Sequence, residues 1–276
     1  MDVTESHASR LPPIDDRWDP RRYDRQELAR GLVDGGIAGP VLSHPMDNVL
    51  GNIRRLLEGD EDKLFGLSGL VGATTAEDVL RLVGRAAGFE PDPLRTTGPV
   101  PVDPSRVLDA CEAVGDRLAF ACSRREQVIL ATGHPVGLAH LYIEVGRQLR
   151  MRGVGLLRPH EGVAWREQDR SGLWEVRFLE GVAMLTDRAS MRHTHSGEPM
   201  ARMLHEATPD LVFADHGFAG AAIESGVETL SIADVNDPAL LVAQAQGRTE
   251  TVIVMDDNVQ PEDYWPCFQA ICARLP

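Results

Sequence analysis

The sequence has 276 residues, a formal net charge of −14 at pH 7 and a pI near 5.0. A chain of this length can bury a full hydrophobic core without disulfides or other staples. The acidic balance argues against a nucleic-acid partner, because such binding draws its affinity from Lys and Arg side chains that meet phosphates. A small anionic substrate remains compatible, since a few local arginines or a metal ion can serve it.

The cysteines and the hydropathy indicate where the protein works. The four cysteines form no CxxC pair, and we expect them to be reduced thiols. No apolar run approaches the ~18 residues that span a bilayer, so we expect no membrane partner. Together these features predict a cytoplasmic protein.

The first hundred residues read as a tail followed by helices. We expect a tail over 1–22, which is either disordered or wraps the body, and a helical N-terminal region with a proline-rich strap over 23–104. Thr75 and Asp78 have the spacing of a helix-entry capping pair. The turn clusters at 35–36 and 43–48 offer a lid or a dimer surface, so a homo-oligomer is compatible with the sequence. His44 has no supporting neighbours and receives no role.

Residues 105–276 alternate between short apolar runs and helical patterns. Runs rich in Val, Ile and Leu that are too short for helices indicate buried strands of a parallel sheet. The stretch over 161–185 instead predicts a β-hairpin added at the sheet. We therefore predict an α/β fold, a three-layer sandwich with a mostly parallel sheet, preceded by the N-terminal helical region. Strands are expected at 127–132, 153–157, 211–214, 229–233 and 251–255, and helices at 138–151, 198–207, 218–225, 238–246 and 261–275.

The predicted strands end in acidic and imidazole side chains. Ligands of parallel α/β sheets bind beyond the carboxyl ends of the strands, so these side chains fall where a site is expected. Asp215 and His216 follow one strand, and Asp256 and Asp257 follow another. A carboxylate beside an imidazole suits a divalent metal or an acid/base pair. The alternative is helix capping, which we favour for Asp237, because it directly precedes a proline at an expected helix start.

Two loops add further candidates. Residues two apart on an extended backbone share a face, so His193 and His195 can present two imidazoles to one metal, or the neighbouring Arg192 can hold a phosphate. The equal alternative is a solvated basic loop in which Ser196 caps the next helix. The turn over 132–138 joins a strand to a helix, where free N–H groups favour anions. There Thr132, Gly133 and Gly137 are candidates for phosphate contacts and His134 for acid/base chemistry, with an ordinary tight turn as the alternative.

Three segments resemble a family of actinobacterial proteins provisionally called phosphatases: residues 131–135, 233–238 and 254–259. The resemblance runs from about residue 25 to the end and implies a phosphatase. It brings no catalytic residues with it. No haloacid-dehalogenase DxDx(T/V), Cx5R or RHG motif occurs, so a metal-activated water is the most economical mechanism for this class.

These observations combine into one hypothesis, a metal-dependent phosphatase that acts on a small phosphorylated metabolite. We expect Asp215, Asp256, Asp257 and His195 to hold a divalent metal, Mg or Mn rather than Zn, while His134 and His216 handle protons. Two other classes stay open: a non-catalytic regulatory module that binds a nucleotide or phosphate, and a sugar-phosphate isomerase or lyase.

Overall fold

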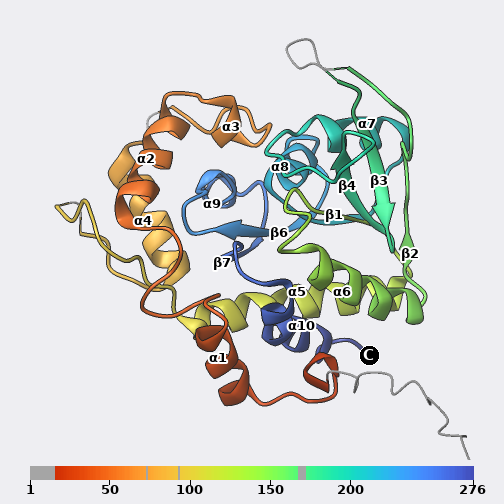
Figure 1. Cartoon of the computed structure of the whole chain (residues 1–276), viewed down its shortest axis with the longest axis horizontal. Helices are drawn as coiled ribbons and strands as arrows, with labels where there is room; N and C mark the ends of the chain where they lie inside the picture. The colour runs from red at the N-terminus through yellow and green to blue at the C-terminus, as the bar shows by residue number, and fades with distance from the viewer. Residues whose placement is uncertain (1–15, 73, 93, 167–171) are drawn as a thin grey trace, which may run out of the picture.

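A mixed, mostly parallel sheet of seven strands forms the centre of the protein (Figure 1). The computed structural model describes residues 16–72, 74–92, 94–166 and 172–276. Along the sheet the order is β3-β4-β1-β5-β6-β7, and the short β2 pairs with the beginning of β1 on the side of β4. The bounds are β1 Gln127–Ala131, β2 Gly155–Leu156, β3 Glu175–Leu179, β4 Val182–Thr186, β5 Leu211–Asp215, β6 Thr229–Asp234 and β7 Thr251–Met255.

The strands match the predicted α/β architecture closely. β4, β5 and β6 are buried along their whole length, as expected for apolar strands covered on both faces. The predicted hairpin is confirmed as β3–β4, whose strands pair antiparallel, while β4 runs parallel to β1. It is therefore a local antiparallel addition to a parallel sheet.

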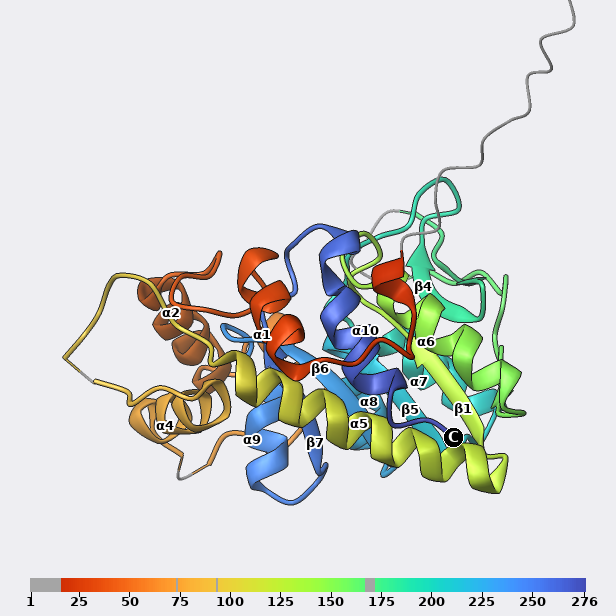
Figure 2. The same ribbon diagram turned by 90° about the horizontal axis from the view of Figure 1, so that it is seen from below.

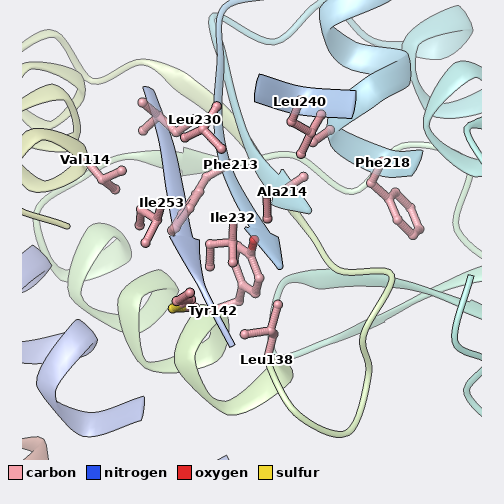
Figure 3. Close-up of a cluster of buried hydrophobic side chains, with 14 of the residues drawn as sticks. Val114, Leu138, Tyr142, Phe213, Ala214, Phe218, Leu230, Ile232, Leu240 and Ile253 are labelled. Carbon is pink, nitrogen blue, oxygen red and sulfur yellow. The ribbon is translucent and has the colours of Figure 1, made fainter. Parts of the chain in front are cut away.

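Helices cover both faces of the sheet and complete the sandwich (Figures 1 and 2). α5, α6 and α10 pack together on one face, and α7, α8 and α9 lie on the other. Phe213 and Tyr142 meet with ring centroids 4.7 Å apart, and Figure 3 shows them among the apolar side chains of the first face. The bounds are α5 Pro104–Arg124, α6 Ala139–Met151, α7 Glu198–Glu206, α8 His216–Glu224, α9 Ala239–Ala245 and α10 Trp265–Cys272, with a 3-10 turn at Pro261–Tyr264.

The N-terminal region is helical, as predicted, and packs against the sandwich. Its helices are α1 Arg25–Asp34, α2 Met46–Leu57, α3 Glu61–Leu64 and α4 Ala76–Ala87, after a 3-10 turn at Asp16–Trp18. α1 packs on α5 and α10, whereas α4 contacts α2 and α9. The predicted capping pair is confirmed, because Thr75 and Asp78 exchange hydrogen bonds of 3.0 and 3.2 Å.

The tail and the proline-rich strap lie at the two ends of the N-terminal region. Residues 1–15 of the predicted tail lie outside the described residues. The part that is described wraps the body, since the Trp18 ring stacks on His140 at 4.1 Å. The proline-rich strap forms neither helix nor strand over 94–103 and makes single bridges from Pro99 to Pro45 and from Val102 to Gly39. Among the described helices, none is long and apolar enough to cross a membrane.

Candidate functional site at the carboxyl ends of the strands

The chain reverses its direction of travel across the sheet between β1 and β5. After β1 it builds β2 and the β3–β4 hairpin on one side, and it then continues with β5 on the other side of β1. Open α/β sheets bind ligands at such a switch point, outside the carboxyl ends of the strands. Five buried acidic residues gather at these ends, each at most 6% exposed as a whole residue: Asp215, Asp234, Asp237, Asp256 and Asp257.

Asp215 and His216 form a buried pair at the end of β5. Oδ1 of Asp215 lies 2.7 Å from Nδ1 of His216 and also accepts a 2.7 Å hydrogen bond from the N–H of Gly133. Burial opposes charge on both groups, but their mutual contact wins: the pKa of Asp215 is lowered and that of His216 is raised to about 9. With Nδ1 occupied, Nε2 of His216 is the nitrogen left to face a ligand.

The backbone at His216 supports this orientation. Its φ is +46°, a left-handed conformation that non-glycine residues seldom adopt. Although Asp215 stands at the N-cap of α8, its side chain makes no capping hydrogen bond. The capping alternative is therefore not what this carboxylate does, and Asp215 instead orients an imidazole.

Three imidazoles converge beside this pair. The ligand atoms of His193, His195 and His216 all lie within 4.8 Å of one another. Nε2 of His193 is 3.0 Å from Nε2 of His195, whose Nδ1 lies 3.0 Å from a carboxylate oxygen of Asp62. Nitrogen ligands of a tetrahedral ion with bonds of ~2.0 Å lie about 3.3 Å apart, so the spacing fits a shared metal.

Desolvation and neighbouring imidazoles keep His193 and His195 neutral, whereas His216, with a pKa of about 9, would release its Nε2 proton when a metal ion binds. Desolvation of the ring, followed by the proximity of His216 and His134, lowers the pKa of His193 to about 4. The pKa of His195 is lowered for the same first reason. Both rings are thus neutral near pH 7, which is the form that binds metals. The observed donor set fits a divalent ion, and imidazoles favour Zn²⁺ or another transition ion over Mg²⁺.

Two glycines allow the histidine loop, residues 193–196, to approach the sheet closely. A Cβ at Gly133 would lie 2.4 Å from the backbone oxygen of Thr194, and one at Gly217 would lie 2.2 Å from that of His195. The loop is also bonded there, because the N–H of Thr194 donates to the Gly133 carbonyl at 2.9 Å. These glycines therefore provide close backbone approach for the loop over 193–196.

The predicted phosphate cradle in the turn after β1 is largely occupied by its own contacts. The N–H of Gly133 donates to Asp215, that of His134 to Oγ1 of Thr132 at 2.9 Å, and that of Gly137 to Nδ1 of His134 at 3.3 Å. These donors are not free for an anion. The turn instead fixes the His134 ring, whose centroid is 4.7 Å from that of His193.

The metal ligands expected from the sequence fall into two groups rather than one. Asp257 belongs with the imidazoles, since its Oδ2 lies 3.6 Å from Nε2 of His216. That oxygen is buried and has no hydrogen-bond partner among the described residues, and burial followed by the Asp234 charge holds the pKa of Asp257 well above its usual value. Asp256 instead lies in a separate group with His44 and Asp234.

Asp237 contradicts the sequence prediction of a helix cap. α9 has Pro238 at its N-cap position and no side-chain capping bond. The Asp237 carboxylate instead lies 3.0 Å from Nζ of Lys63, and both side chains are 7% exposed. Burial opposes its ionisation, but the charges of His216 and Lys63 hold the pKa of Asp237 below its ordinary value. A buried ion pair to the chain's single lysine outweighs capping here.

Sequence reasoning missed the residues that the N-terminal region contributes. Lys63, Asp62 and His44 reach the strand ends from segments more than 130 residues away. Lys63 carried one available signal, because a single lysine in an arginine-rich chain is unusual in composition. For His44 the sequence holds no such signal.

A hollow of about 990 Å³ opens beside the exposed edge of the imidazole trio. It is lined by residues of α3, α7 and the histidine loop, among them His193, His195, Asp62 and Arg202. The Arg202 guanidinium pairs with Glu198 at 2.7 Å and lies over the Trp165 ring, while its Nε is buried without an acceptor among the described residues. The predicted Arg192 is paired with Asp187 and is not among the residues that line this hollow. A hollow of similar size between α4 and α5 contains none of the strand-end residues.

Fold and side chains together define an α/β protein with a cluster of imidazoles and carboxylates at its topological switch point. Comparison with known proteins identifies the particular group. The chain belongs to the phosphatase family, whose model matches residues 23–275. It is 35% identical over 252 residues to Phosphatase SCO2771 of Streptomyces coelicolor. The aligned region covers 89% of this chain and 94% of that protein. No solved structure matches. The resemblance to actinobacterial phosphatases is confirmed.

Proposed function

We propose that this member of the phosphatase family is a metal-dependent phosphomonoesterase acting on a small phosphorylated metabolite. The observation that carries the proposal is the convergence of His193, His195 and His216 beside the unpartnered carboxylate oxygen of Asp257. These four side chains would hold a divalent ion, for which the donors favour Zn²⁺ or Mn²⁺. Once bound, the ion would polarise a phosphoryl oxygen and lower the pKa of a water molecule.

Asp215 is a positioning residue in this proposal. It holds Nδ1 of His216 and so keeps Nε2 directed at the ligand site, in the manner of the carboxylate–histidine pairs that support metal ligands elsewhere. Its second contact, to the N–H of Gly133, fixes the carboxylate itself. Asp215 thus acts on the reaction through the imidazole.

His134 is suited to donate a hydrogen bond to the leaving-group oxygen. Its Nδ1 accepts from the Gly137 N–H, which assigns the ring proton to Nε2. Burial lowers the pKa of His134, so the ring is neutral near pH 7 and keeps that single proton. The Nε2–H of this neutral ring would donate a hydrogen bond to the departing oxygen and stabilise its developing charge, while the alkoxide would take its proton from water.

The size and lining of the adjoining hollow support a small substrate. A volume of about 990 Å³ suits a metabolite. The Arg192 guanidinium is held by Asp187, and Nη2 of Arg202 is paired with Glu198 at 2.7 Å. The Nε of Arg202, which has no acceptor among the described residues, would be the donor for an anionic group.

The test is phosphate release from a panel of phosphorylated metabolites by EDTA-stripped protein, with Mg²⁺, Mn²⁺ or Zn²⁺ added back. We expect one metal to restore turnover and the His193→Ala/His195→Ala variant to lose at least about 10²-fold, since the rate requires the bound ion. His205→Ala, which removes an exposed imidazole on α7, is the matched control and should remain unaffected.

Other outcomes would point elsewhere. Full activity in EDTA would refute metal dependence while leaving a phosphatase. Protection against melting by nucleotides without phosphate release would favour the regulatory module. A rearranged sugar phosphate without free phosphate would favour an isomerase, which product analysis by NMR would detect.

A further inference from the structure

A second group of metal-binding side chains lies outside the imidazole trio. Ligand atoms of His44, Asp234 and Asp256 all fall within 4.8 Å of one another. Asp234 ends β6 and is opposite Met255 in the register with β7, so Asp256 follows one residue beyond its level. His44 reaches them from the segment before α2. Asp234 and Asp256 are 2% and 1% exposed.

The two carboxylates are held in place, and one oxygen between them lacks a donor. Asp256 accepts hydrogen bonds from the N–H groups of Ser43 at 2.7 Å and Asn258 at 3.0 Å. Oδ1 of Asp234 accepts one from the N–H of Asn236 at 3.2 Å. Oδ2 of Asp234 is buried and accepts no hydrogen bond among the described residues; Nδ1 of His44 lies 3.1 Å from it as an ion-pair contact and 3.0 Å from Oγ of Ser43.

The negative charge of Asp234 and Asp256 also favours binding of a cation between them. Of the buried cations, Lys63 pairs with Asp237 and His216 pairs with Asp215. Among the described residues, the basic neighbour of Asp234 and Asp256 is the half-buried imidazole of His44. Two adjacent buried carboxylates are costly unless paired or bound to metal, and a divalent ion neutralises both.

We infer that His44, Asp234 and Asp256 form a second divalent-cation site, which rests on the proposed function and makes the centre a two-ion site. Consecutive residues of one strand end serve the two groups, since Asp256 faces His44 and Asp257 faces His216. One imidazole with two carboxylates favours Mn²⁺ or Mg²⁺, whereas the imidazole trio with Asp257 favours Zn²⁺ or Mn²⁺, so Mn²⁺ suits both groups. Two ions would clamp the attacking and leaving oxygens of a phosphoryl transfer.

The test counts bound ions on the full chain and needs no substrate. EDTA-stripped protein is titrated with Mn²⁺ by isothermal calorimetry, and metal content is measured by mass spectrometry after gel filtration. We expect two ions per chain in the wild type, one in His44→Ala and one in His193→Ala/His195→Ala. Asp234→Asn preserves shape and should match His44→Ala, which guards against a folding defect in either variant. His205→Ala should retain two.

The outcomes separate this inference from the proposed function. One ion per wild-type chain, lost in the His193→Ala/His195→Ala variant and kept in His44→Ala, would overturn the second site and leave the phosphatase proposal standing. One ion lost in His44→Ala and kept in the double variant would support this site and refute the imidazole site. No bound ion in the wild type would refute both.

Discussion

The buried pair of Lys63 and Asp237 gives the sharpest prediction about what holds the N-terminal region to the sheet. Lys63→Met removes the cation while keeping most of the apolar stem, and it leaves the Asp237 carboxylate buried beside Asn52 and His216, at 3.5 and 3.9 Å. Breaking a buried ion pair typically costs about 3–5 kcal/mol, because the remaining charge stays out of water. The nearby imidazolium compensates part of that charge, so we expect about 3 kcal/mol.

The measurement is urea unfolding of metal-free protein at pH 7, as a double-mutant cycle with Asp237→Asn. The combined variant should cost less than the sum of the singles by about 2 kcal/mol, since both members of the pair are then uncharged. Arg81→Met is the matched control, because it removes a cation whose partners Glu77 and Asp78 are exposed, and it should leave the urea midpoint essentially unchanged. A Lys63→Met variant as stable as Arg81→Met would refute the reasoning.

Three further predictions concern the loop approach, the metal site and acid stability. Gly217→Ala should displace the histidine loop and weaken Mn²⁺ binding measured by calorimetry. Gly51→Ala is the control, because a Cβ at this position in α2 meets open space, and it should stabilise the protein against urea by about 0.5–1 kcal/mol. Asp215→Asn should weaken metal binding about 10- to 100-fold with little change in secondary structure by circular dichroism; unchanged affinity would remove its positioning role. Hydrogen bonds, first from the Ser68 side chain, lower the pKa of Glu224 to about 2 in the folded protein. The ionised Glu224 therefore stabilises the fold above its unfolded pKa near 4.5, and this stabilisation is lost as the pH falls toward 2. In Glu224→Gln the urea midpoint should change less with pH between about 2 and 4.5 than it does in the wild type. The same pH dependence in both proteins would contradict this.

The fold was largely predictable because its strands are buried on both faces. Continuous apolar runs such as 251–255 leave few alternatives to a parallel strand, and the observed β7 has the expected bounds. α3 was missed, since a four-residue helix carries no periodicity. The 3-10 turn that precedes α10 was likewise merged into one longer predicted helix.

The site was predictable only in its location. Strand ends place Asp215, Asp256 and Asp257 at one edge of the sheet, but spacing along the chain does not reveal which neighbour each carboxylate meets. Asp237 illustrates the limit, because its position before a proline indicates a cap while its partner Lys63 is 174 residues away. Partners supplied by a distant segment leave no pattern in the sequence.

The long separation between these partners also bears on the order of folding. Ser43 and Asp256 are 213 residues apart, so the contact between them cannot form during synthesis until β7 has emerged. Closing so long a loop is entropically unfavourable before other contacts compensate for it. A nascent chain that stalls before β7 would therefore carry Asp215 and Asp234 without the neighbouring carboxylates of Asp256 and Asp257.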